Sequence, residues 1–449
     1  MIPKTKRLSV FLLLLFGSIL LLTAALWNGF PLLYADSSTY IASGFTVDTP
    51  VDRPMMYGLF IRLTSFNGIS IWVTIFIQCF MVSYLVFITI RDFTRFDTNK
   101  TYLAVMLVIS FLTALPFVTG QILADVFMPI CFLSIVHILY NDKLSRTSLI
   151  GLFFLFFLSN TMHMSHVAIN AIVVISSIVL YWFWPERYKM KWKNGIVLIL
   201  LTLIAIPFMG SALAKSKHVF FTGKMAGSGI LQEYLAEHCP EKDYKICDCI
   251  DSIPSNTTDF LWNESSPLYT RYESWYDAKS DFSDIIWGSF KSPHYIGRHI
   301  KESLISTSVQ LITFDAGEGN GSFGKESLLF QRIKNYFPND YDTYLSSIQY
   351  AGRLMPKYLE SRNIIFRISV IIGLVLIFVI LIIHQLYPPL KKLSILLLIA
   401  VFVNSFVNSS LVIVADRFGA KMIWLIPFIA TLFLIDYILS KQQHLKFNT

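Results

Sequence analysis

Long apolar segments recur along almost the whole chain, and they limit what it can fold into more than any other feature. The 449 residues are 54% hydrophobic and only 15% charged. A bilayer core of about 30 Å is crossed by about 20 apolar residues in a helix. We predict an all-α polytopic membrane protein with about ten transmembrane helices: Leu8–Trp27, Ser70–Ile90, Tyr102–Phe117, Ile122–Tyr140, Ser148–Thr161, Val167–Trp184, Gly195–Leu213, Ile364–Leu386, Leu393–Ala415 and Met422–Leu439. The third and fifth are short, so either could be re-entrant, or tilted with buried ends.

Basic loops between these segments predict the orientation. Cations gather in the loops 4–7, 91–100, 141–146, 186–193 and 387–392. Positively charged short loops stay in the cytoplasm, so both termini are expected there. The formal charge of +8 then serves topology and contact with anionic lipid heads, and it indicates no nucleic-acid partner. We expect a multi-pass protein of the bacterial inner (cytoplasmic) membrane.

The predicted topology divides the chain into three parts. Residues 1–213 form an N-terminal transmembrane half with a first outer loop at 28–69, residues 214–363 form an outer-face domain, and residues 364–449 form the last transmembrane helices. Within the outer-face domain we expect helices at Met225–Glu237, Asp281–Phe290, His294–Ile312 and Tyr341–Glu360, and no sustained strands.

The five cysteines fall into two groups. Cys79 and Cys131 lie within predicted spans and are expected to pack as small apolar residues. Cys239, Cys247 and Cys249 lie in the outer-face segment, where an oxidising compartment would allow Cys239 to pair with either of the other two.

Ionisable side chains at the membrane boundary are the candidate functional residues. Asp36 follows the first span, where a carboxylate is costly to keep, so we interpret it as the candidate catalytic base. Arg53, His163, His166 and Arg417 are candidate ligands of a phosphate group, because Arg meets phosphate oxygens in a bidentate way and His changes charge near neutral pH. Their alternative roles are structural, as ion pairs of Arg53 with Asp52 or Asp36 and of Arg417 with Asp416 or a lipid head.

Aromatic and amide-rich stretches point to a second kind of contact. Tyr40, Tyr57, Trp262 and Trp275 are candidate sugar-binding residues, since sugar C–H faces stack on aromatic rings. The alternative is that such rings form a domain core or the membrane-interface belt. Lys224 lies in "GKMAGSG", which lacks the order of a nucleotide-binding P-loop. It stays a candidate contact to a lipid-borne phosphate.

Three motifs resemble those of membrane glycosyltransferases of the GT-C class. They are "DRPMMYGLFIRL" in the first outer loop, "QILADVFMPICFLSIVHILY", in which Asp125 begins a span, and the late Arg-containing "DRFGAKMIWLIPFIA". The resemblance implies transfer of a sugar from a polyprenyl-phosphate donor to a glycan, lipid or protein acceptor on the outer face, with inversion, in cell-envelope glycan biosynthesis. It also implies catalytic carboxylates at Asp36 and Asp125. The alternative for Asp125 is a structural one, as a helix cap or an interhelical partner. Asp36 is followed by "SSTY" rather than by a second acidic residue, which leaves use of a divalent metal open.

The same mechanism follows from the chemistry of the residues. A hydroxyl acceptor needs a carboxylate to take its proton as the bond to phosphate breaks, and fixed cations stabilise the departing phosphate. Two other classes stay open. One is an O-antigen-type polysaccharide polymerase or ligase, suggested by the outer arginines in "GRHI", "QRI" and "AGRLMPK". The other is a non-enzymatic transporter or scaffold. Asn404 and Asn408, one helical turn apart, are expected to bond to neighbouring helices.

Overall fold

The computed structural model describes residues 4–183, 190–209, 211–354 and 356–447. In these residues every element of regular secondary structure longer than a single bridge is a helix. The only pairing of β type among them is a single bridge between Leu32 and Gln121. The predicted all-α class is therefore confirmed for the described residues. The predicted end of the sixth span at Trp184 and the first part of the basic loop, residues 186–189, lie outside the described residues.

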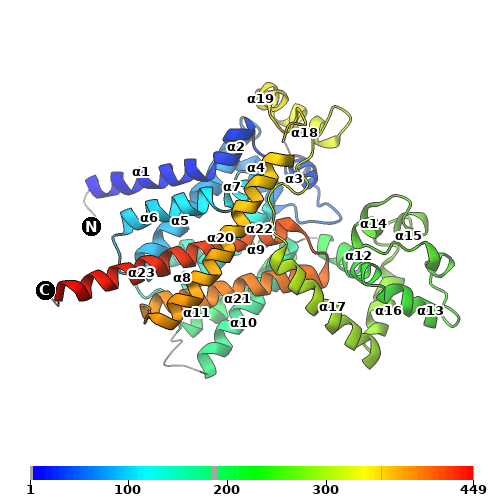
Figure 1. Cartoon of the computed structure of the whole chain (residues 1–449). Coiled ribbons are helices and arrows are strands. Elements are labelled where there is room, and N and C mark those ends of the chain that lie inside the picture. The colour runs from blue at the N-terminus through cyan, green and yellow to red at the C-terminus, as the bar shows by residue number, and fades with distance from the viewer. Residues whose placement is uncertain (1–3, 184–189, 210, 355, 448–449) are drawn as a thin grey trace.

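Most of the chain forms a bundle of apolar helices (Figure 1). The bundle helices are α1 (Lys4–Leu21), α2 (Thr23–Asn28), α5 (Ile71–Phe93), α6 (Thr98–Phe111), α7 (Leu115–Thr119), α8 (Phe127–Tyr140), α9 (Arg146–Thr161), α10 (Met164–Phe183), α11 (Trp192–Phe208), α20 (Pro356–Ile383), α21 (Pro388–Leu411), α22 (Asp416–Ile423) and α23 (Leu425–Phe447). A short 3-10 helix, η1 (Ala124–Val126), leads into α8.

Within the residues that the structure describes, nine stretches of the bundle are apolar. Five are long and apolar enough to cross a membrane, judged by length and composition: Ile71–Phe93, Met164–Phe183, Tyr358–Ile383, Pro388–Leu411 and Asp416–Gln442. Four more are apolar but only 10–17 residues long: Leu8–Leu21, Ala124–Tyr140, Arg146–Thr161 and Trp192–Phe208.

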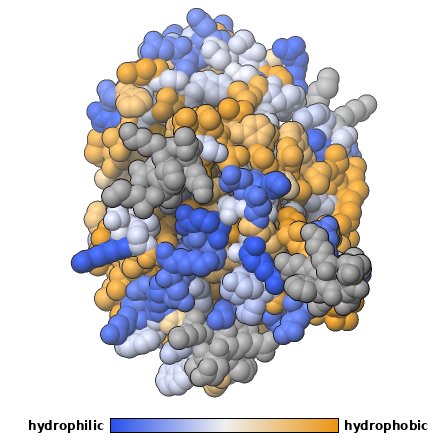
Figure 2. Space-filling view, turned by 90° about the vertical axis from the view of Figure 1, so that its left-hand side faces the viewer, coloured by the Kyte–Doolittle hydropathy of each residue, from blue (hydrophilic) through white to orange (hydrophobic). Residues whose placement is uncertain are grey.

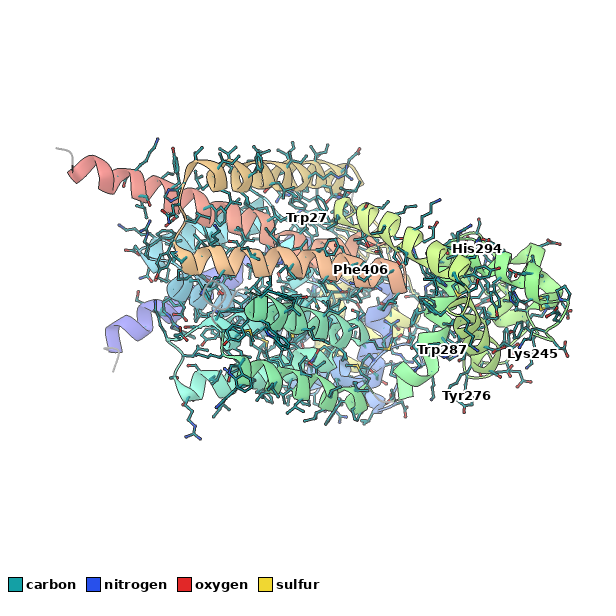
Figure 3. The ribbon with its side chains drawn as sticks, turned by 90° about the horizontal axis from the view of Figure 1, so that it is seen from below. Trp27, Lys245, Tyr276, Trp287, His294 and Phe406 are labelled. Atoms are coloured by element: carbon teal, nitrogen blue, oxygen red, sulfur yellow. A yellow bond between two sulfur atoms is a disulfide. The ribbon has the colours of Figure 1, made fainter. Side chains whose placement is uncertain are left out.

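A separate helical domain projects from one end of the bundle. Its helices are α12 (Ser211–Gly227), α13 (Ile230–His238), η2 (Cys247–Ser252), α14 (Thr257–Trp262), α15 (Pro267–Thr270), α16 (Lys279–Ser289) and α17 (Pro293–Ile312). The domain has its own hydrophobic core, to which Phe260, Phe282 and Tyr295 contribute. A disulfide joins Cys239 to Cys247 and leaves Cys249 free, which decides between the two pairings expected from the sequence. Trp287 lies on the side of the domain nearer the bundle and Lys245 at its far end (Figure 3).

The segment 214–363, predicted as one outer-face domain, divides into two parts in the structure. Residues after Ile312 leave the projecting domain and pack on the bundle, where Phe314, Phe330 and Tyr344 belong to the main core. They include α18 (Leu328–Tyr336), η3 (Pro338–Asp340) and α19 (Tyr341–Ser346), and α18 packs on α3 (Ala35–Thr46). The helix α4 (Met56–Thr64) follows α3 in the same loop. The first outer loop is thus largely helical, a difference from the predicted loop.

Several predicted helices are broken at residues that disfavour helical backbone. The third span splits into α6 and α7. Pro116 lies in the first turn of α7, the position in a helix where a residue without a backbone N–H is tolerated. The predicted helix Tyr341–Glu360 ends at Ser346 and resumes only at Pro356, with Gly352 at φ 66° between them. The predicted helix Met225–Glu237 is interrupted at Gly229, where φ is 74°. Conversely, 416–421 form the start of α22, although a loop was predicted there.

The two ends of the bundle differ in character. Both chain ends lie at one end of the bundle, and the projecting domain lies at the other (Figure 1). The end with the chain ends exposes a group of hydrophilic side chains flanked by hydrophobic ones (Figure 2).

Candidate functional site

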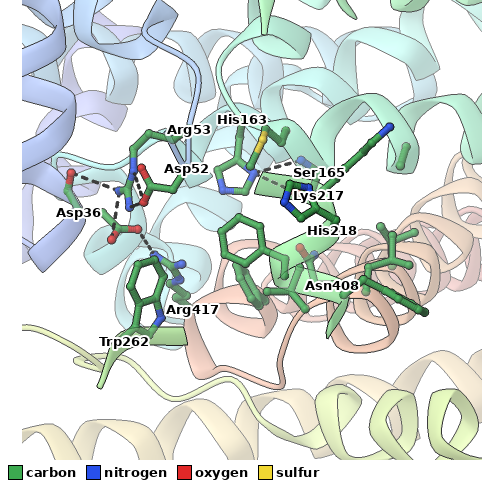
Figure 4. A pocket seen from close by; sticks show the side chains of 18 of the residues that line it. Asp36, Asp52, Arg53, His163, Ser165, Lys217, His218, Trp262, Asn408 and Arg417 are labelled. Carbon is green, nitrogen blue, oxygen red and sulfur yellow. Dashed lines mark hydrogen bonds and ion pairs between the residues drawn. The ribbon is translucent and has the colours of Figure 1, made fainter. Parts of the chain in front are cut away.

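A cavity of about 850 Å³ lies where the projecting domain meets the bundle. Its walls come mainly from α3, α10, α12, α14 (Thr257–Trp262), α16, α21 and α22 and from the segment between α3 and α4. Much of the wall is apolar, and the apolar lining residues include Met164, Phe220, Phe221, Ile286, Trp287, Val407, Leu411, Val412 and Phe418. Polar side chains gather at two places in it (Figure 4).

At one of these places Asp36 lies between two arginines. Its Oδ1 is 3.0 Å from Nη1 of Arg53, and its Oδ2 accepts a hydrogen bond of 2.8 Å from Nη1 of Arg417. Asp36 occupies the first turn of α3, where the positive end of the helix dipole favours a carboxylate. The sequence indicated Asp36 as one alternative ion-pair partner of Arg53 and did not pair it with Arg417. The structure brings all three into direct contact, and all three line the cavity.

The charge state of Asp36 follows from these contacts. Burial alone would raise the pKa of the Asp36 carboxyl, but the guanidinium groups of Arg417 and Arg53 outweigh burial and hold this pKa below its ordinary value. Asp36 is therefore ionised at neutral pH and is a weak base while both arginines hold it.

Further contacts fix the two arginines. Arg53 also forms an ion pair with Asp52, and its guanidinium lies 5.1 Å from the ring centroid of Tyr40. Arg417 lies over the ring of Tyr34 at 4.7 Å. Oε2 of Glu318 accepts a hydrogen bond of 2.9 Å from the backbone N–H of Arg417. Both guanidinium groups are thus held in place and still face the cavity, as an anion-binding site requires.

Asp125 has a different environment. Its Oδ1 accepts a hydrogen bond of 2.7 Å from Nζ of Lys421, and both side chains are almost completely buried. Lys421 follows Arg417 by one helical turn on α22. Asp125 does not belong to the cavity lining, so the structure sets it behind the site rather than in it.

The two predicted histidines also separate. His163 lines the cavity, and its Nδ1 accepts from the backbone N–H of Ser165 at 3.2 Å. His166 is fully buried, with its Nδ1 2.8 Å from the carbonyl oxygen of Ser159, and lies outside the lining. The ring centroids are 5.4 Å apart.

Of the four predicted sugar-binding aromatics, two reach the cavity. Tyr40 and Trp262 line it, and Trp262 is half exposed. Tyr57 is fully buried and donates a hydrogen bond of 2.6 Å to Oε1 of Gln78. Trp275 packs on Phe220 in the domain core. The alternative noted for these rings, a structural one, describes the positions of Tyr57 and Trp275.

The remaining predicted ligands lie elsewhere. Nζ of Lys224 donates to Oγ of Ser306 at 2.5 Å, outside the lining. Among the described residues, no group of three or more His, Cys, Asp and Glu side chains could hold a metal ion. Asn404 donates a hydrogen bond of 2.7 Å to the carbonyl oxygen of Phe418 on α22, a contact between helices as expected. Asn408, for which the same was expected, instead donates to Asn404 on its own helix.

The lining residues that sequence reasoning missed include Lys217, His218, Ser283 and Trp287. They lie on α12 and α16, and the packing of α12 against α21 cannot be inferred from local patterns. It also missed Lys421, which lies four residues after Arg417 in a segment predicted as a loop. The two share one helical face only because the segment forms α22.

Comparison of the chain with protein-family models, with curated proteins and with solved structures finds no match. The assignment of a function therefore rests on the geometry of the cavity and on its chemistry.

Proposed function

We propose that this protein is a membrane glycosyltransferase that moves a sugar from a polyprenyl-phosphate donor to a hydroxyl acceptor. The observation that carries the proposal is the cluster of Asp36, Arg53 and Arg417 on the wall of a cavity whose lining is otherwise largely apolar. Such a cavity suits an amphiphile that carries an anionic group, because two cations can receive the phosphate while apolar walls receive the chain.

The proposed setting is a multi-pass topology of about ten spans with both termini in the cytoplasm. It is supported by the five long and four shorter apolar helices among the described residues. It is also supported by the position of both chain ends at one end of the bundle, opposite the projecting domain. The cavity would then lie at the outer membrane boundary, within reach of lipid-borne donors.

The mechanism begins with competition for the arginines. A donor phosphate that binds Arg417 and Arg53 takes cations away from Asp36, so the pKa of the Asp36 carboxyl rises and the group becomes a better base. Asp36 then accepts the proton of the acceptor hydroxyl while the hydroxyl oxygen bonds to the anomeric carbon. The bond from that carbon to the phosphate oxygen breaks, and the electron pair leaves with the polyprenyl phosphate. The arginines stabilise the charge that develops on this phosphate.

The polymerase or ligase alternative depends on arginines of the outer segment. Arg298 forms an ion pair of 2.9 Å with Glu233 in the projecting domain. Arg298, Arg332 and Arg353 are all absent from the lining of the described cavity. The glycosyltransferase proposal is therefore better supported by the position of the cations. The transporter or scaffold alternative has no specific observation in its favour.

The proposal is tested with purified protein in lipid nanodiscs, radiolabelled polyprenyl-phosphate sugars and membrane extract as the source of acceptor. Wild type is expected to transfer label, and Asp36→Asn to lose about 100-fold or more of the rate, as removal of a general base does. A matched control is Glu233→Gln, which breaks the ion pair with Arg298 outside the cavity. Equal transfer by wild type and Asp36→Asn would remove Asp36 from the mechanism.

A further inference from the structure

The second polar region of the cavity lies away from the arginines and includes His218 and Asn408 (Figure 4). His218 comes from α12 in the projecting domain, and Asn408 comes from the last turn of α21 in the bundle. These two helices pack against each other. Both side chains are at least nine-tenths buried, and each has one polar atom without a hydrogen-bond partner among the described residues.

The unpartnered atom of His218 is a hydrogen-bond acceptor. Its Nε2 lies 2.7 Å from the carbonyl oxygen of Trp275, which can only accept, so Nε2 carries the proton. Burial lowers the pKa of the His218 imidazole by more than its bond to Trp275 raises it, so the ring is neutral at pH 7. Nδ1 then offers a bare lone pair, and it is this atom that has no partner.

The unpartnered atom of Asn408 is also an acceptor. Its Nδ2 donates to the backbone oxygen of Asn404 at 2.8 Å and to the side-chain oxygen of the same residue at 3.1 Å. These two bonds use the amide hydrogens and fix the orientation of the amide. Oδ1 is left buried without a donor. A buried polar atom without a partner costs about 1–3 kcal/mol of stability, so two of them on one cavity wall suggest a ligand that supplies donors.

The two polar regions therefore differ in the chemistry they accept. The arginines offer donors and suit an ionised phosphate, which has only acceptors. The bare acceptors His218 Nδ1 and Asn408 Oδ1 need O–H groups instead. Trp262 and Trp287 also line the cavity and offer rings on which a sugar can stack.

We propose that His218 and Asn408 form a subsite that binds the hydroxyl groups of an uncharged sugar. This inference rests on the proposed function, for which it names the sugar-recognising residues. The sugar belongs either to the donor or to the acceptor, and both present the same hydroxyl chemistry.

The test uses equilibrium binding of tritiated probes to the full chain in nanodiscs, with empty nanodiscs subtracted. The probes are farnesyl phosphate, farnesyl-phosphoryl sugars and hexyl glycosides, the last two each in glucosyl, galactosyl and mannosyl form. His218→Phe and Asn408→Leu are each expected to weaken binding of at least one sugar probe about five- to tenfold. Binding of farnesyl phosphate is expected to stay at the wild-type level, which also shows that the variants are folded.

Two further variants separate recognition from structure. His218→Gln keeps an amide donor for Trp275 and an acceptor for the ligand, and is expected to restore much of the sugar binding. His299→Phe is the matched control, because His299 is a hydrogen-bonded histidine of the same domain that lies outside the cavity lining. It is expected to leave the affinity for every probe unchanged.

The outcomes separate the two sources of the sugar. A selective loss with the farnesyl-phosphoryl sugars assigns the subsite to the donor sugar, and a loss confined to hexyl glycosides assigns it to the acceptor. Unchanged binding of all sugar probes, or an equal loss with farnesyl phosphate, would overturn the subsite. Failure of farnesyl phosphate to bind wild type would count against the proposed function, while the hexyl glycosides would still test the subsite.

Discussion

Two ion-pair clusters join α22 to the first third of the chain, and they differ in their access to the cavity. Arg417 pairs with Asp36, and 21% of each side chain is exposed. Lys421, one turn further along α22, pairs with Asp125, with 0% and 4% of the side chains exposed. The chemistry of the pairs is alike, yet one lines the cavity and the other is enclosed by protein.

The difference teaches which charges can change partners. An enclosed pair has lost its hydration and is held by the mutual attraction of its members, so removing one member leaves an uncompensated charge. The pair at the cavity can exchange its contact for a ligand. We infer that Asp125 and Lys421 position α22, and hence Arg417, whereas Asp36 and Arg417 act on the ligand.

The largest expected effect breaks the enclosed pair. Lys421→Met leaves Asp125 buried without its cation and is expected to lower the free energy of unfolding by about 3–5 kcal/mol. Titration of the protein in mixed micelles with SDS, checked for reversible refolding, measures this free energy of unfolding. Relative to wild type, the fraction of folded protein should fall more than the transfer activity of each folded molecule.

The double variant Asp125→Leu/Lys421→Met sharpens the comparison. Replacing both members by apolar residues removes the charge that a single change leaves behind, and such replacement is often neutral or stabilising. We expect it to recover most of the lost stability. If the double variant is as unstable as Lys421→Met, the pair does more than compensate charge.

The second effect concerns the cation at the cavity. Arg417→Gln is expected to weaken binding of farnesyl phosphate about 10- to 100-fold, since a hydrogen bond between charged groups contributes about 1.5–3 kcal/mol. The free energy of unfolding should change little. Arg62→Gln is the matched control, because Arg62 bonds to Asn67 and lies outside the lining. Equal affinities of Arg417→Gln and wild type would show that phosphate binds elsewhere.

The smallest effect is a shift in pH dependence. Because Arg417 and Arg53 together hold the pKa of Asp36 below its ordinary value, Asp36 stays deprotonated to lower pH, and the acid limb of kcat/KM should lie correspondingly low. Arg53→Gln removes one cation, so the pKa of Asp36 rises and the acid limb should move up by about one pH unit. A profile that does not move would mean that another group controls this limb.

The sequence predicted the helical class and, as one alternative, the ion pair of Arg53 with Asp36, for a simple reason. It did not pair Arg417 with Asp36, a contact that comes from the structure. In a chain with few charged residues, those at the ends of apolar segments must find partners, and Arg53 and Arg417 were the cations at that boundary. The interhelical bond of Asn404 was predicted on the same ground. These inferences need only composition and the position of each residue relative to an apolar segment.

Other parts of the site could not be predicted in this way. Lys421 appeared to lie in a loop, and only the helix α22 places it opposite Asp125. The place of His218 in the cavity depends on how α12 of the projecting domain packs on α21. His218 and Asn408 are 190 positions apart in the sequence, so local patterns do not bring them together. Tyr57 and Trp275 show the opposite error. Both were predicted to bind sugar, and both are buried in a hydrophobic core instead.

The most direct test of the account compares transfer per folded molecule in two variants, Asp36→Asn and Asp125→Leu/Lys421→Met, in nanodiscs with a radiolabelled polyprenyl-phosphate sugar. The account predicts that Asp36→Asn folds like wild type and transfers almost no sugar, whereas the double variant keeps most of the transfer rate. An active Asp36→Asn, or an inactive but well-folded double variant, would contradict it by exchanging the roles of the two clusters.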